Sequence, residues 1–367
     1  MSSAELPLPA SPVEPGSRFL EEIREQPDAL LRLLEGDAVF ARVAAEIHAR
    51  GATTIRMVGH GSSDNAASYG VYAFGLLPRW TSLRDSISLT VYYGAELDMS
   101  GCTALALSQS GRTPDVVEYT RQARRRGAFT VAITNDASSE LAREADAVLE
   151  LRAGPEHAVA ATKTYSNQLA ALCLLAAHAA GEGDVFADGI RGLADTMRQL
   201  TASVETRIAN VARPFAYAGR MFVVGRGAEF ATAREIALKL LETCRIAAEP
   251  LTATDLAHGP VAALDSLFPV WAIASDDATL PAVVEAVERA REAGATIVAS
   301  GNAAESISGA EYVLASPRTA SPITTASTSN LKSATRASAS STRIRIPTFT
   351  TTTSGNCSPP APIPRAG

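Results

Sequence analysis

Two hydrophobic periodicities alternate along the chain. Short apolar runs typical of buried strands lead into polar turns, and then into segments where apolar residues recur every three or four positions, as on one helix face. In the first half of the chain this pattern predicts strands at 53–58, 88–93, 103–107, 129–133 and 147–151. Helical periodicity fills residues 19–50, and Gly51 stands where a helix-terminating glycine would. The alternation predicts an α/β fold in which a doubly wound parallel sheet is flanked by helices.

The second half of the chain repeats the first. The strand RMFVV enters Gly225-Arg226-Gly227 as the strand ending at Val58 enters Gly59-His60-Gly61. The run PVWAIA, the helix PAVVEAVERAREAGA and the strand TIVAS parallel TALALS, PDVVEYTRQARRRGA and FTVAIT. We interpret this as duplication of one α/β unit. The predicted organisation is a disordered N-terminus at 1–16, a first unit with N-terminal helices at 17–188, a linking helix at 189–209, a second unit at 210–316 and an aberrant tail at 317–367.

A hydroxyl-rich turn, Ser108-Gln-Ser-Gly-Arg-Thr113, separates one predicted strand from a helix. Thr113 stands at the expected N-cap and Pro114 at the first helical position. Free N–H groups at a helix start, with hydroxyls and a glycine, suit a phosphate. An ordinary strand–helix connection also favours these residues. The repeat has Ser275-Asp-Asp-Ala278 instead, whose carboxylates would repel phosphate, so we expect only the first copy to bind an anion.

A second group of candidate residues lies between residues 233 and 260. Glu235, Lys239 and Glu242 are spaced i, i+4 and i+7 and so share a helix face. They could be a solvated ion-paired face, or Glu242 could be a general base held beside a cation. His258 lies in a Leu-Ala-His-Gly-Pro turn, and a lone histidine is more often structural. Together with the phosphate turn, a carboxylate and an imidazole suggest proton transfer on a sugar phosphate.

Charge and composition exclude several classes of function. The net charge is −6, and no Asp or Glu follows Glu311, whereas six basic residues do; without those six, 27 basic residues face 39 acidic ones, a net of −12. Such a body is a poor nucleic-acid binder. The four cysteines lie singly, without metal-ligand spacing, so we expect neither a metal nor another cofactor. No signal peptide or spanning apolar run is evident, which predicts a cytoplasmic protein without a membrane partner.

The chain resembles the SIS (sugar isomerase) domain family, with two tandem SIS units. The similarity is strongest to the isomerase half of the glutamine–fructose-6-phosphate aminotransferases (glucosamine-6-phosphate synthases) and to the related amino-sugar-phosphate deaminases. It rests on motifs in the family's order across about residues 20–316: GHGSSDN, SQSGRTPD, AGPEHAVAATKTYSNQL, GRGAEFATAREIALKLLE and DLAHGP.

The resemblance implies a set of site residues. Those matching the family's sugar-phosphate ligands are Ser63, Ser108, Gln109, Ser110 and Thr113. Val159 matches a backbone contact to substrate, and Ala161 stands where the synthases have a serine. Lys239 and Glu242 match the catalytic helix, with Glu242 moving the proton between C1 and C2. His258 matches a ring-opening histidine donated by a neighbouring subunit, which implies a homodimer with a shared active site.

Two departures from the family affect the expected activity. The synthases begin with a glutaminase whose nucleophile is an N-terminal cysteine, but this sequence starts Met-Ser-Ser and its first cysteine is Cys102. We therefore expect no glutamine hydrolysis by that route. The family also ends in a loop carrying a catalytic lysine, which the tail at 317–367 does not resemble. That tail is rich in Ser, Thr, Pro, Ala and Arg and fits a disordered extension; we favour a frameshift, since neighbouring-frame codons spell a family-like Asp-Pro-Asp segment.

The sequence as a whole predicts a phosphosugar isomerase or deaminase. Its substrate would be an amino-sugar 6-phosphate. The enzyme would open the sugar ring and transfer a proton between C1 and C2. The products would be ammonia or an amine and a ketose 6-phosphate. Two alternatives stay open: an aminotransferase-type isomerase without the glutaminase domain, and a non-catalytic sugar-phosphate sensor.

Overall fold

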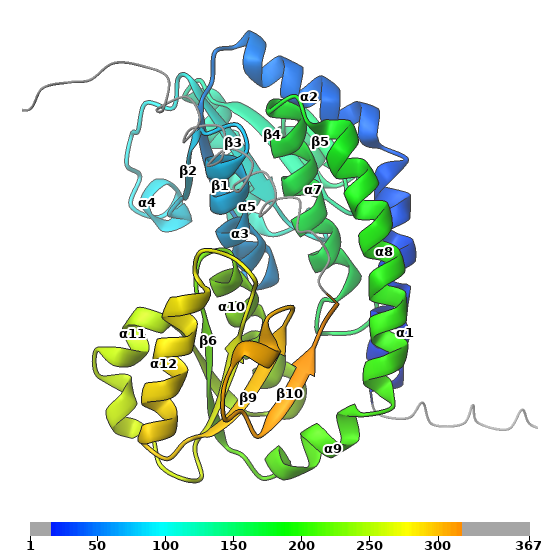
Figure 1. Ribbon diagram of the computed structural model, residues 1–367. Coiled ribbons are helices and arrows are strands. Elements are labelled where there is room, and N and C mark those ends of the chain that lie inside the picture. Colours follow the sequence, from blue (N-terminus) through cyan, green and yellow to red (C-terminus); the bar gives the residue numbers. More distant parts are fainter. Residues whose placement is uncertain (1–15, 318–367) are drawn as a thin grey trace, which may run out of the picture. The chain divides into compact units, whose positions relative to one another are not determined.

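The computed structural model describes residues 16–317, all of which fall within one compact unit (Figure 1). Predictions about the N-terminal residues before 16 and about the tail from 318 onward, including the frameshift, lie outside the described residues. No helix among residues 16–317 is long and apolar enough to cross a membrane.

The first sheet contains five parallel strands in the order β2-β1-β3-β4-β5. Their bounds are β1 Thr54–Val58, β2 Thr81–Arg84, β3 Cys102–Leu107, β4 Phe129–Thr134 and β5 Ala147–Glu150. Leu105 at the centre of β3 pairs with Met57 of β1 and Val131 of β4. All three are fully buried, as expected for a parallel sheet covered on both faces. Four of the five predicted strands are confirmed.

The predicted strand at 88–93 is wrong. The chain there forms α4, Ile87–Val91, and the edge strand is β2 instead. Ser86 caps α4 by accepting the Leu89 N–H at 3.4 Å, and Ile87 and Thr90 bury one face of the turn. The β-branched residues suggested a strand, but the cap and the packing of this short face override that preference.

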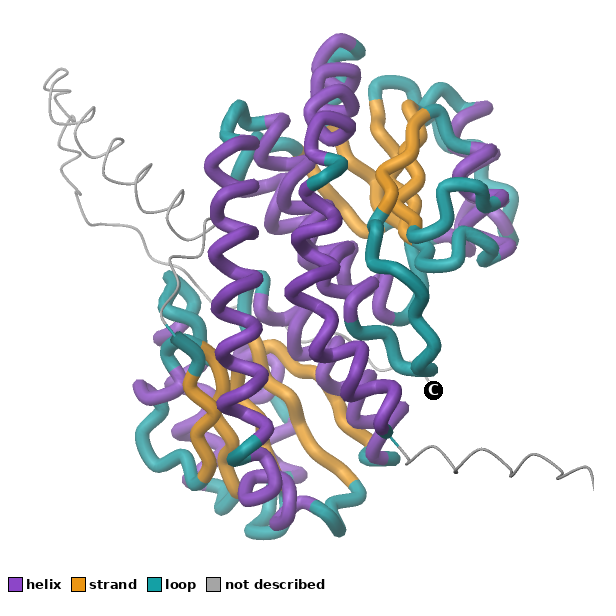
Figure 2. Tube along the Cα trace, turned by 90° about the vertical axis from the view of Figure 1, so that its right-hand side faces the viewer, coloured by secondary structure: helices purple, strands orange, loops and turns teal. Residues whose placement is uncertain are grey.

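Helices cover both faces of the first sheet (Figures 1 and 2). On one face lie α1 Ser17–Leu34, α2 Asp37–Ala49, α3 Ser62–Leu76, α7 Lys163–Ala179 and α8 Gly183–Glu205. On the other lie α4, α5 Pro114–Arg125 and α6 Glu140–Glu144. The long helices α1 and α8 pack side by side and antiparallel, since Arg24 pairs with Glu205 and Asp28 with Arg198.

The second sheet repeats this plan. Its parallel strands follow the order β7-β6-β8-β9-β10. Their bounds are β6 Arg220–Gly225, β7 Ala247–Thr252, β8 Pro269–Ile273, β9 Thr296–Gly301 and β10 Tyr312–Ala315. One face carries α10 Glu229–Lys239, and the other carries α11 Ala253–Ala257 and α12 Leu280–Glu292. Shorter elements are α9 Ile208–Ala212 and the turns η1 Arg213–Phe215, η2 Leu240–Cys244, η3 Pro260–Ala263 and η4 Ala304–Ser306.

Strand order identifies the counterparts in the two sheets: β1 with β6, β2 with β7, β3 with β8, β4 with β9 and β5 with β10. The crossover from β1 to β2 runs through α3, and the corresponding crossover from β6 to β7 runs through α10. The predicted fold of two duplicated α/β units is confirmed.

Candidate functional site

The hydroxyl-rich turn lies where β3 ends and α5 begins, as predicted. Thr113 occupies the N-cap with extended backbone, but its side chain does not cap the helix; its Oγ1 lies 3.0 Å from Ser108 Oγ. Gly111 has a φ of 61°, and a Cβ there would lie 2.1 Å from Ser139 Oγ. The turn therefore requires glycine at this position. In the first turn of α5, the N–H groups of Asp115 and Val116 have no acceptor among residues 16–317 and are available to a ligand.

A cavity of about 210 Å³ opens beside this turn. Five of the predicted ligand residues line it together with Ala161, and they are Ser63, Ser108, Gln109, Ser110 and Thr113. The remaining lining residues are His60, Ser62, Leu107, Thr164 and Gln168. None of these side chains is a carboxylate, and most carry a hydroxyl or an amide. Such a lining suits a small anionic ligand.

Ser63 is held in a donating orientation. It is buried at the start of α3, and its Oγ accepts the Gln168 Nε2 hydrogen at 2.9 Å. Because no other partner for that hydroxyl occurs among residues 16–317, its own proton is free for a ligand oxygen. Gln168 comes from α7 and is 1% exposed.

Lys239, the last residue of α10, joins this helix to the cavity. Its Nζ lies 3.2 Å from Ser62 Oγ, 3.3 Å from Glu235 Oε1 and 2.6 Å from Glu242 Oε2. Ser62 lines the cavity, so the Lys239 ammonium lies one hydrogen bond from a lining residue, and Glu242 is linked to that residue through Lys239. The side chain of Lys239 is only 18% exposed, which argues against an ordinary solvated ion-paired face.

Glu235 holds Ser62 and Lys239 in place. It is 6% exposed and accepts hydrogen bonds at 2.8 Å from Ser62 Oγ and from Asn65 Nδ2. Beyond Lys239 the helix widens into the π-helical turn Leu240–Cys244, which carries Glu242. Insertions of this kind are frequent at functional sites because they redirect one side chain.

His258 and Val159 do not line the cavity within one chain. His258 is exposed at the end of α11, and its ring has no hydrogen-bond partner in the described part of the chain. Val159 is 98% exposed. The predicted role of His258 across a subunit interface and the predicted backbone contact of Val159 stay predictions.

In the counterpart turn of the second unit, a side chain of the turn itself occupies the hydrogen-bond donors. Asp277 stands where the first unit has Ser110, and its Oδ1 accepts the Thr279 N–H at 2.7 Å and the Thr279 hydroxyl at 2.6 Å. Ser275 donates to Glu229 Oε1 at 2.6 Å. The carboxylate thus takes donors that a bound anion would need, which agrees with the expectation that only the first turn binds one.

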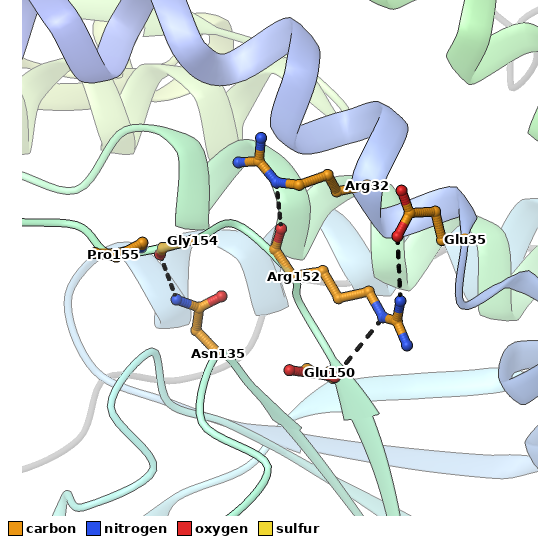
Figure 3. Close-up of a pocket in the computed structure, with 7 residues that line it drawn as sticks. All are labelled: Arg32, Glu35, Asn135, Glu150, Arg152, Gly154 and Pro155. Atoms are coloured by element: carbon orange, nitrogen blue, oxygen red, sulfur yellow. Dashed lines mark hydrogen bonds and ion pairs between the residues drawn. The ribbon is translucent and has the colours of Figure 1, made fainter.

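A larger cavity of about 590 Å³ holds none of the predicted site residues (Figure 3). Its two guanidinium groups are already engaged: Arg152 contacts Glu35 at 3.4 Å and Glu150 at 3.7 Å, and Arg32 Nε donates to the Arg152 carbonyl at 3.1 Å. Asn135 donates to the Gly154 carbonyl at 2.8 Å. We interpret these contacts as anchoring the segment that leads into the next loop.

Sequence reasoning missed several lining residues. Thr164 and Gln168 fall one helical turn apart at the start of α7, within the quoted motif AGPEHAVAATKTYSNQL. Their i, i+4 spacing was the available signal, but a buried polar pair on a helix resembles many structural pairs. His60 lines the same cavity, with Nε2 2.8 Å from Asp115 Oδ2.

Comparison with known proteins identifies a family and several relatives of this chain. The SIS domain family model matches residues 49–178 and 215–337. The glutamine–fructose-6-phosphate aminotransferase of Aeropyrum pernix is 36% identical over 294 residues, covering 77% of this chain and 47% of that protein. The chain thus spans about half the length of the curated relatives it matches.

Two solved structures share the fold. One is a proposed phosphosugar isomerase from Silicibacter pomeroyi, with TM-score 0.70 and 35% identity over 82% of this chain and 88% of that one. The other is the C-terminal domain of glucosamine-fructose-6-phosphate aminotransferase from Francisella tularensis, with TM-score 0.75 and 24% identity over 86% of this chain and 94% of that one.

Proposed function

The chain belongs to the SIS domain family, and on that premise we propose that it is an enzyme that converts an amino-sugar 6-phosphate to a ketose 6-phosphate. One observation carries the proposal: the anion-suited turn and the Lys239–Glu242 pair meet at one cavity, through Ser62. A phosphate in the turn would leave the sugar carbons directed toward an acid–base pair.

We assign phosphate binding and proton transfer to different residues of the site. Ser63, Ser110 and the first-turn N–H groups of α5 would bind the phosphate. Glu242 would remove the proton from C2 and return it to C1, while Lys239 holds this carboxylate by ion pairing. His258 from a second subunit would take the C1 hydroxyl proton and supply one to the ring oxygen. Water would then hydrolyse the C2 imine, releasing ammonia and leaving the ketose.

The experiment is an ammonia-release assay. Purified protein is incubated with glucosamine 6-phosphate, with fructosamine adducts and with unphosphorylated glucosamine. We expect ammonia and a ketose 6-phosphate from glucosamine 6-phosphate, amine and an aldose 6-phosphate from phosphorylated fructosamine adducts, and no product from unphosphorylated glucosamine. No release from any phosphorylated amino sugar would contradict a deaminase.

Relation to the aminotransferases favours a second candidate, an ammonia-dependent isomerase running in the opposite direction. Fructose 6-phosphate and ammonia would then yield glucosamine 6-phosphate, and glutamine would not replace ammonia. A sensor would bind the sugar phosphate without converting it in either direction. The same assay, run both ways, separates the three.

A further inference from the structure

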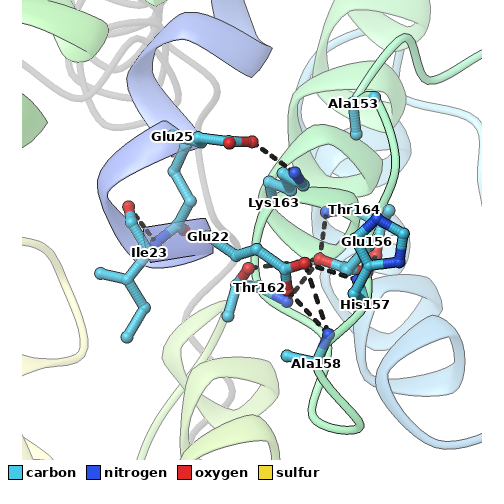
Figure 4. A network of polar contacts seen from close by, with 12 residues as sticks. Glu22, Ile23, Glu25, Ala153, Glu156, His157, Ala158, Thr162, Lys163 and Thr164 are labelled. Atoms are coloured by element: carbon cyan, nitrogen blue, oxygen red, sulfur yellow. Dashed lines mark hydrogen bonds and ion pairs between the residues drawn. The ribbon is translucent and has the colours of Figure 1, made fainter. Parts of the chain in front are cut away.

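The loop of residues 155–162 reaches the candidate site through Ala161 and is anchored on α1 by hydrogen bonds to Glu22 (Figure 4). Ala161 on this loop lines the cavity next to the phosphate turn. Glu22 of α1 accepts the N–H groups of His157 and Ala158; the Ala158 nitrogen lies 3.3 Å from one carboxylate oxygen and 3.2 Å from the other. A helix more than a hundred residues away in sequence therefore holds the start of the loop.

A second carboxylate holds the end of the loop. Glu156 Oε1 accepts the Thr162 N–H at 2.9 Å and the Thr164 N–H at 3.2 Å. Its carboxylate also accepts both threonine hydroxyls. Residues 159–161 are thus the only part of the loop between the two anchors, and their position depends on both.

Glu22 is a buried carboxylate that has no cation to pair with in the described part of the chain. It is 5% exposed, and burial of a charge is costly unless strong hydrogen bonds compensate. Two successive backbone N–H groups provide such bonds. A neutral side chain would be cheaper to bury here, so packing alone does not account for the charge. The two hydrogen bonds by which the carboxylate anchors the loop account for the charge.

We propose that Glu22 is a positioning residue for recognition of the sugar. By holding the N–H groups of 157 and 158 it fixes the short segment 159–161, and with it the position of Ala161 at the cavity, so that this segment selects the sugar end of the ligand. The turn at 108–113 binds the phosphate end independently. This inference rests on the proposed function, since it assigns the loop to the sugar of the same phosphosugar.

The test measures two ligands on the full chain. Calorimetry gives the Kd for inorganic phosphate and for fructose 6-phosphate in the wild type, Glu22→Gln and Glu22→Ala. We expect Glu22→Gln to weaken fructose 6-phosphate about tenfold, and Glu22→Ala more, with phosphate changed less than about twofold. Glu21→Gln is the matched control, because it removes the same charge from the neighbouring exposed position.

Phosphate binding also reports that each variant is folded. Equal weakening of both ligands, or no weakening of either, would overturn the role of Glu22. Hydrogen exchange at the amides of 157 and 158 should accelerate in Glu22→Gln and not in Glu21→Gln; unchanged exchange would likewise overturn it. A wild type that binds neither ligand would refute the proposed function, and the exchange result would still show whether Glu22 holds the loop.

Discussion

The hydroxyl of Ser110 has a proton to donate, because its oxygen accepts the Arg112 N–H at 3.3 Å and no acceptor for the proton lies among residues 16–317. Ser110→Ala should therefore weaken a hexose 6-phosphate by about 1–3 kcal/mol, the usual loss for a hydrogen bond to a charged group. The free hexose should bind as before. The duplication offers a matched control, Ser275→Ala, in the counterpart turn. Titration calorimetry decides, and an equal loss for both sugars would argue against phosphate in this turn.

Glu242 carries the proposed proton transfer. Glu242→Gln keeps its size and hydrogen bonding but removes the base, so kcat should fall about 10²–10⁴-fold with little change in KM. Glu288→Gln, an equal charge change on an exposed face of α12, should leave both constants unaltered. Steady-state kinetics on the deaminase substrate provides the readout, and full activity of Glu242→Gln would locate the base elsewhere.

Side-chain positions could be predicted from the sequence where they depend on the spacing of residues along one helix. The shared helix face of Glu235, Lys239 and Glu242 is present, although a π-helical turn carries the last of them. Such positions could not be predicted where they depend on contacts between residues far apart in the sequence. Nothing local in the sequence shows that Gln168 reaches Ser63, 105 positions away, or that Glu22 holds the 157–158 amides.

At the level of elements, α3 and α10 are joined by a charged cluster. Asp64 on α3 accepts Arg84 Nε and Arg234 Nη2, each at 2.8 Å. Burial raises the pKa of Asp64, but its hydrogen bonds and charge attraction with the two arginines outweigh burial and hold the pKa below its ordinary value of 3.8.

This shift predicts how stability depends on pH. A carboxyl whose pKa is lower in the folded state contributes stability above its unfolded pKa, and loses it as the pH falls through the folded value. Asp64→Asn should therefore lower the free energy of unfolding at pH 7, and the difference from wild type should shrink below about pH 4. Urea titrations at several pH values measure it. A difference that stayed constant with pH would show that the carboxylate charge is not involved.

Elements were predictable where a strand is buried on both faces. Central strands such as β3 and β4 are continuous apolar runs, so hydrophobicity alone reveals them. The edge strand β2, Thr-Ser-Leu-Arg, is half polar and carries no such signal. Its neighbour α4 was mistaken for a strand because five residues are too few to show a helical period.

For the whole molecule, the proposed active site takes residues from two chains. His258 lies away from the cavity within a chain, as a residue donated to a neighbour would. Mixing inactive Glu242→Gln and His258→Ala chains should restore part of the activity, because one site of a mixed dimer would contain both wild-type residues. The measurement requires subunit exchange, followed by mass spectrometry; inactive mixed dimers would place His258 outside a shared site.

The filled turn of the second unit has a practical consequence for anyone measuring stability. Asp277 is a carboxylate built into its own turn, whereas the proposed site at Ser108–Thr113 would take its anion from solution. Any ion that binds only the folded state raises the melting temperature in proportion to the logarithm of its concentration. Phosphate buffer would thus stabilise the folded chain through the first turn and gain nothing from its counterpart. Substitutions that weaken phosphate binding in the first turn would therefore look more destabilising in phosphate than in a buffer without it.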